Sequence, residues 1–192
     1  LEGTDGRGYV TGLAGVYQID LMTGAVESTF GPAPYPQIEI TPDRRTLIVS
    51  HYDKAISAYD ISTASAELVA THNGQFSGIL PSPDNAHVYC RTTSGTDGPN
   101  LEFPLPELAP GRSFGTSGIL QNISVGPDGS IYQPIQSYPD SVVVYDPISL
   151  QVSRELEISH RPFTDWDLST VLFDSDPDNF FLLANSYGQT EL

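Results

Sequence analysis

Alternating acidic residues near the end of the chain form its most metal-like pattern. Asp174, Asp176 and Asp178 occupy every second position, and Asn179 follows them. Carboxylate oxygens in such an alternation are typical of calcium-binding loops. The glycine and the distant glutamate that usually complete the loop are missing. Because the same Pro-Asp pair recurs elsewhere in turns, we interpret this segment as a turn and predict no metal and no cofactor.

Four histidines could supply acid–base or ligand chemistry. They are His51, His72, His87 and His160, and no two are spaced like a zinc-binding pair. We expect His51 and His87 at strand ends, and the other two in loops. Serine, histidine and aspartate are plentiful, but no Gly-x-Ser-x-Gly nucleophile elbow and no glycine-rich phosphate loop occurs. Catalytic residues therefore stay unassigned.

Polar and aromatic side chains gather in the loops 31–36, 72–76, 115–118 and 160–166. Loops held by a rigid scaffold often carry binding residues. If a ligand binds, we expect it at these loops and at the start of the strand after loop 115–118, where Gln121 and Asn122 lie. The residues expected to bind it are Tyr35, His72, Asn73, Gln121, Asn122, His160, Arg161, Asp165 and Trp166.

The elements that would position these loops follow from a repeat. A Pro-Asp pair begins at Pro42, Pro83, Pro127 and Pro177, each time between two apolar runs, so the period is roughly forty residues. Proline presets the backbone angle of a turn, and aspartate bonds the backbone two residues on. Each pair is therefore predicted to be a hairpin turn between the first and second strands of a unit.

The apolar runs themselves predict strands, because they are short, rich in Val, Ile, Tyr and Phe, and separated by Gly, Pro, Asn and Asp. Each unit contains up to four strands, which is typical of a β-propeller blade rather than of a solenoid. We therefore predict an all-β fold, a β-propeller of about four blade equivalents. The whole chain, residues 1–192, is then a single propeller domain or a partial propeller. The expected blade repeats lie near 8–36, 37–75, 76–118, 119–165 and, as a partial blade, 166–192.

The first unit resembles a known family of repeats. Gly8-Tyr9-Val10-Thr11-Gly12 is followed by Val16-Tyr17-Gln18-Ile19-Asp20 and then by Thr23-Gly24-Ala25-Val26. This order is similar to the YVTN-type β-propeller repeat, which occurs in surface-layer proteins and in lactonase-like seven-bladed propellers. The resemblance implies blade architecture and the placement of the connecting loops around a central channel. No catalytic motif of those groups can be matched here.

Counting strands predicts that the chain starts and stops within a blade. Three complete blades are expected, with the last three strands of one blade before them and the first two of another after them. The chain would then be about half of a seven-bladed ring, inside a longer product; a closed four-bladed ring is the alternative. An open half leaves apolar faces and sheet edges uncovered, so it would need another chain, another copy or further repeats.

The composition limits which classes of partner the chain can bind. The chain has 8 basic and 24 acidic residues and a formal net charge of −16, which disfavours binding to nucleic acid or to an anionic membrane surface. No segment is long and apolar enough to span a bilayer. Cys90 is the only cysteine, so no disulfide can form within the chain. Scarce cysteine and lysine with abundant small polar residues favour an extracellular, cell-surface or periplasmic location.

Three functions remain open at this point. The first is a non-catalytic binding or scaffold module that contacts a protein partner. The second is a lactonase-like or other hydrolytic propeller enzyme with its site at the channel mouth. The third is a structural subunit that assembles with copies of itself or with a second chain through open blade edges.

Overall fold

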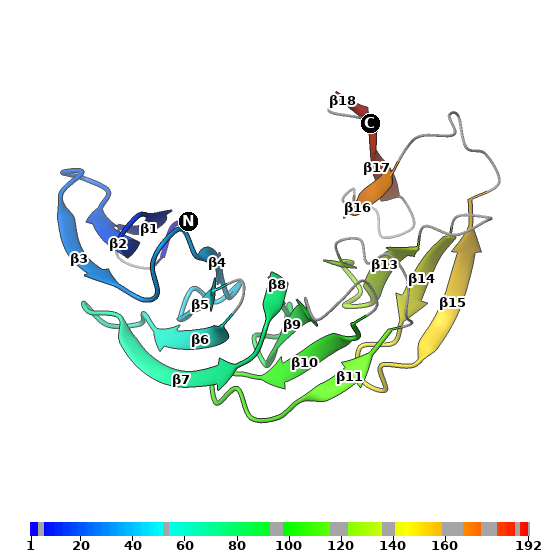
Figure 1. The fold of residues 1–192 in the computed structure, drawn as a ribbon, viewed down its shortest axis with the longest axis horizontal. Coiled ribbons are helices and arrows are strands. Elements are labelled where there is room, and N and C mark those ends of the chain that lie inside the picture. The colour runs from blue at the N-terminus through cyan, green and yellow to red at the C-terminus, as the bar shows by residue number, and fades with distance from the viewer. Residues whose placement is uncertain are drawn as a thin grey trace. The chain divides into compact units, whose positions relative to one another are not determined.

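The computed structural model describes residues 1–3, 6–51, 54–92, 98–115, 123–135, 141–158, 167–173, 180–186 and 189–191 (Figure 1). Every regular element in these ranges is a β-strand, and the strands pair into antiparallel sheets. This confirms the all-β prediction. The chain divides into two compact units, residues 1–94 with 100–113 and residues 95–99 with 114–192.

The first unit holds three sheets, which we call A, B and C. Each is a meander in which strands adjacent in sequence pair with one another. Sheet A consists of β1 (Arg7–Gly12), β2 (Gly15–Asp20) and β3 (Val26–Phe30). Sheet B consists of β4 (Gln37–Ile40), β5 (Thr46–His51), β6 (Ala55–Asp60) and β7 (Glu67–Asn73). Sheet C consists of β8 (Phe76–Pro81), β9 (His87–Thr92), β10 (Asn100–Pro104) and β11 (Arg112–Phe114).

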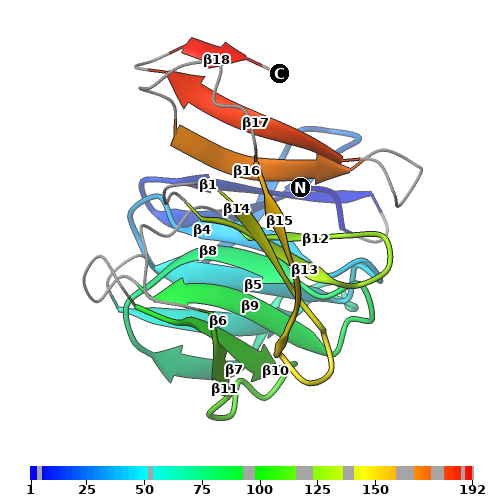
Figure 2. The ribbon, with the colours of Figure 1, turned by 90° about the vertical axis from the view of Figure 1, so that its right-hand side faces the viewer.

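The second unit holds sheets D and E. Sheet D consists of β12 (Ser124–Val125), β13 (Ile131–Ile135), β14 (Ser141–Tyr145) and β15 (Val152–Glu157). Sheet E consists of β16 (Asp167–Phe173), β17 (Phe180–Ser186) and β18 (Gln189–Glu191), side by side in that order (Figure 2). The expected ending after a second strand was wrong by one element, because β18 pairs with β17 through Ser186 and Gln189.

The described Pro-Asp turns confirm the predicted hairpins. In the first, the Thr41 hydroxyl donates to Asp43 Oδ1 at 2.7 Å and accepts the backbone N–H of Thr46 at 3.0 Å. Ser82 does the same with Asp84 and His87. The residue after each aspartate has a positive φ, which is 59° at Arg44, 64° at Asn85 and 82° at Gly129. An arginine there is unexpected, since this backbone region favours Gly and Asn.

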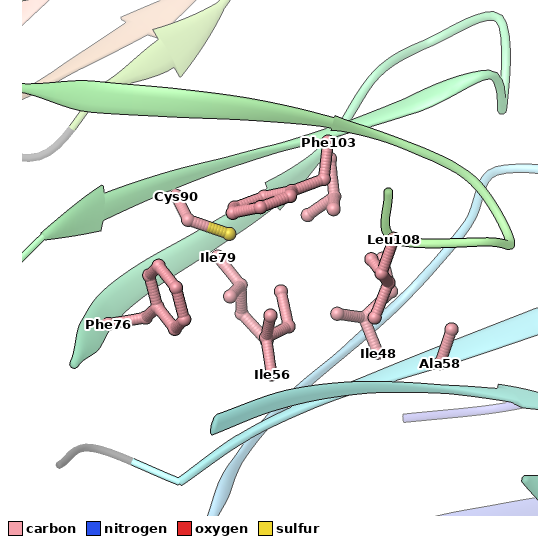
Figure 3. Close-up of a cluster of buried hydrophobic side chains, with 9 residues drawn as sticks. Ile48, Ile56, Ala58, Phe76, Ile79, Cys90, Phe103 and Leu108 are labelled. Atoms are coloured by element: carbon pink, nitrogen blue, oxygen red, sulfur yellow. The ribbon is translucent and has the colours of Figure 1, made fainter. Parts of the chain in front are cut away.

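Sheet B is packed on both faces. Successive residues of a strand point to opposite sides of the sheet, so neighbouring residues of one strand contact different sheets. On one side Leu47, Val49, Tyr59 and Ile61 pack against Tyr9 and Val16 of sheet A. On the other side Ile48, Ile56 and Ala58 pack against Phe76, Ile79, Val88, Cys90, Phe103 and Leu108, from sheet C and its loop between β10 and β11 (Figure 3). We call the side that meets the earlier sheet the preceding face, and the other side the following face.

Sheets D and E repeat this arrangement within the second unit. Tyr132, Val142 and Val144 of sheet D pack with Val171 of sheet E, and Phe173 lies against the same cluster. The ring of Phe173 meets the ring of Tyr132 edge-on, with centroids 4.7 Å apart. Val171 and Phe173 therefore mark the preceding face of sheet E.

Candidate functional site

Most of the residues expected to bind a ligand fall where the structure gives no description. Gln121, Asn122, His160, Arg161, Asp165 and Trp166 lie outside the described residues. The acidic pattern at 174–179 lies outside them as well. The structure therefore places three of the expected residues, namely Tyr35, His72 and Asn73.

Tyr35 lies in the loop that joins sheet A to sheet B. Its side chain is 64% exposed, its φ is 46°, and its backbone N–H donates to the carbonyl of Gly12 at 2.9 Å. The same loop is held to sheet B, because His51 Nε2 lies 3.0 Å from the carbonyl oxygen of Ala33. The loop is thus anchored to both sheets and presents the Tyr35 ring to solvent.

His72 and Asn73 are not in a loop, contrary to the prediction. Both belong to β7, where His72 pairs with Ile56 and Asn73 with Ala55 of β6. The His72 ring is half-buried, and its centroid lies 4.7 Å from that of Phe103 and 6.0 Å from that of Phe76. His72 therefore contributes to the apolar packing between sheets B and C.

The three described residues do not form one site. His72 and Asn73 are chain neighbours whose side chains leave opposite faces of β7, and Tyr35 lies in the loop before sheet B. Asn73 is exposed. No shared pocket or acid–base pair among them follows from their contacts.

Sequence reasoning missed a buried ion pair on sheet C. Glu102 of β10 is 3% exposed, and both of its carboxylate oxygens accept hydrogen bonds from Arg112 of β11. The distances are 2.7 Å from Nε and 2.9 Å from a terminal guanidinium nitrogen. A glutamate within an apolar strand was the only signal in the sequence. Its partner follows from strand pairing, which the sequence does not show.

The neighbours of this pair indicate a structural role. His87 Nε2 lies 4.0 Å from the carboxylate, and Tyr89 is its cross-strand partner. Burial, followed by the charge of Glu102, raises the pKa of Tyr89 to about 12. The hydrogen bond to Glu102 raises the pKa of Arg112. A carboxylate with both oxygens bound to an arginine is poorly suited to act as a general base, because its lone pairs are already engaged.

The outermost strands β3, β7 and β15 expose most of their residues. On β7, Leu68 and Val69 are exposed beside Glu67. Over the described ranges, no group of three or more His, Cys, Asp or Glu residues could hold a metal ion. In the same ranges no helix is long and apolar enough to cross a membrane.

No protein-family model matches the sequence, and a comparison with curated protein sequences gives no match either.

Proposed function

We propose that this chain is part of a β-propeller and acts as a non-catalytic binding or scaffold module, located outside the cell or in the periplasm. Its partner in this proposal is another protein surface. Neither nucleic acid nor a cofactor takes part.

The observation that carries the proposal is the double packing of sheet B. Leu47 and Val49 contact the sheet before it, while Ile48, between them in sequence, contacts the sheet after it. Four-stranded meanders stacked face to face in chain order are the building pattern of a propeller. The same relation between sheets D and E supports it independently.

The use of polar side chains supports a scaffold rather than an enzyme. Thr41, Ser82 and the aspartates after them close the turns between first and second strands. Asp20 and Asp146 do so between third and fourth strands, each accepting two backbone N–H groups. Glu102 is engaged by Arg112. These groups are thus already engaged within the fold, and the exposed surface of β7 remains as a contact surface for a partner.

A hydrolysis screen tests the proposed function. The purified chain is assayed on lactones and esters, beside His72→Ala and His160→Ala variants. The proposal predicts no turnover above the buffer rate for any of the three proteins. Turnover that falls at least about tenfold in either variant would show that a histidine takes part in chemistry, and would replace the scaffold function by the hydrolase alternative.

A further inference from the structure

The first two sheets are equivalent residue by residue. In sheet A the pairs between β1 and β2 run from Arg7–Asp20 to Gly12–Gly15. In sheet B the pairs between β5 and β6 run from Thr46–Asp60 to His51–Ala55, with the same number of steps. Each position on sheet A therefore has a counterpart on sheet B, and their surroundings can be compared directly.

The preceding face of sheet B is covered. Its residues on β5, Leu47 and Val49, are at most 1% exposed, and so is Ile61 just after β6. Tyr59, which pairs with Leu47, is buried with them. Sheet A provides the cover, through Tyr9 and Val16 on its following face.

The counterpart face of sheet A is open. Val10, which corresponds to Val49, is 43% exposed, and Leu21, which corresponds to Ile61, is 47% exposed. Val26 of β3 lies on the same face, because it pairs with Ile19, and it is also exposed. Glycines on this face leave room for larger side chains. A Cβ at Gly8 would meet Leu21 at 2.7 Å, and one at Gly12 would meet the Tyr17 ring at 2.5 Å.

A second open face lies at the other end of the chain. Val171 and Phe173 pack on sheet D, so the residue between them, Leu172, points to the following face of sheet E. Leu172 is 42% exposed, and its cross-strand partner Phe181 is 56% exposed. On sheet A, the equivalent following face covers sheet B.

We propose that copies of this chain associate head to tail, with the following face of sheet E in one copy covering the preceding face of sheet A in another. The repeat itself specifies this occupant, because among the described residues the preceding faces of sheets B, C and E are each covered by the following face of the sheet before. The inference rests on the proposed scaffold function and adds a second copy as a partner, which binds through sheets A and E rather than through β7. Such a heterologous contact produces either a closed ring or an open chain of copies.

Analytical ultracentrifugation of the full chain over a range of concentrations tests the inference. Salt of about 0.15 M or more is needed, because the net charge of −16 opposes association. The wild type should form species of two or more copies. Val10→Glu and Phe181→Glu should each weaken association at least about tenfold, because each places a charge in an apolar contact. Leu21→Glu is a second variant on the first face, should Val10→Glu fail to fold.

Mixing the two interface variants gives the decisive test. Val10→Glu keeps the sheet E face intact and Phe181→Glu keeps the sheet A face intact, so an equimolar mixture should form a species of two chains. Ile148→Glu, in the exposed turn between β14 and β15, is the matched control and should leave association unchanged. A monomeric wild type, or association that needs only one of the two faces, would overturn the inference. Neither result affects the hydrolysis screen, so failure of the scaffold function would be seen separately.

Discussion

The side-chain oxygen of Asn85 accepts a hydrogen bond from the backbone N–H of Asp43 at 2.9 Å. The two residues belong to Pro-Asp turns of neighbouring sheets, and they are 42 positions apart in sequence. The bond therefore joins one repeat to the next at the same turn in each. Asn85 serves two purposes, since it also adopts the positive φ that its own turn requires.

Replacement of the two positive-φ residues by glycine should have opposite effects. Arg44→Gly should stabilise the protein by about 0.5–1 kcal/mol, because glycine adopts this backbone conformation without the strain of a side chain. Asn85→Gly should destabilise it by up to about 1 kcal/mol, because the bond to Asp43 is lost and asparagine was little strained. Urea unfolding of the three proteins measures both changes.

The neighbouring arginine provides the control for that pair. Arg45 has no positive φ among the described backbone angles, so Arg45→Gly should destabilise the protein through the greater freedom of the unfolded chain. Stabilisation by Arg45→Gly, or equal effects of Arg44→Gly and Asn85→Gly, would contradict the interpretation.

Removing one partner of the ion pair on sheet C should destabilise the protein more than removing both. Arg112→Leu leaves the buried Glu102 carboxylate without its two hydrogen bonds and should cost roughly 2–3 kcal/mol of unfolding free energy. The cost is below that of a fully buried pair because Arg112 is partly exposed. Adding Glu102→Leu to that variant should recover part of the loss. The exposed pair of Glu2 and Arg44 is the control, and Glu2→Gln should cost less than about 0.5 kcal/mol. A double variant less stable than Arg112→Leu alone would argue against a buried charge.

Stability should fall in acid because the turn aspartates are bound as carboxylates. The hydroxyl of Ser82, with smaller contributions from other groups, lowers the pKa of Asp84, and the N–H of Met22 is the largest contribution that lowers the pKa of Asp20. A lowered folded-state pKa means stability that is present above the unfolded pKa of about 3.9 and lost as the pH falls through the folded value. Thermal melts between pH 7 and pH 2 should show this loss, and Asp84→Asn should reduce its steepness. A melting temperature that is constant down to pH 2 would be inconsistent with this linkage.

Cys90 should be inert to thiol reagents in the folded protein. It is fully buried in the cluster between sheets B and C, and burial raises the pKa of its thiol (Figure 3). The thiolate is the reactive form, so labelling should occur only through unfolding and should accelerate strongly in denaturant. Iodoacetamide labelling followed by mass spectrometry measures this. Rapid labelling without denaturant would mean that the two sheets do not pack as described.

Much of the strand order could be predicted from the sequence, because Pro-Asp turns and short apolar runs are local signals. Other features depend on contacts distant in sequence. The pairing of Glu102 with Arg112 depends on the position of β11 beside β10. His72 was predicted in a loop because the polar residues at the end of β7 do not show the apolar pattern that predicts a strand. Arg44 shows that the turn imposes its backbone angle even on a residue that disfavours it.

The most direct measurement of the central claim is methyl-to-ring nuclear Overhauser effects on protein with labelled Leu, Val and Ile methyl groups. The claim is that neighbouring residues of β5 contact two different sheets. We expect cross-peaks from Leu47 and Val49 methyls to residues of the cluster that contains Tyr9 and Val16, and from Ile48 methyls to residues of the cluster that contains Phe103 and Leu108. Cross-peaks from Ile48 to Tyr9, or from all three residues to the same ring, would contradict it.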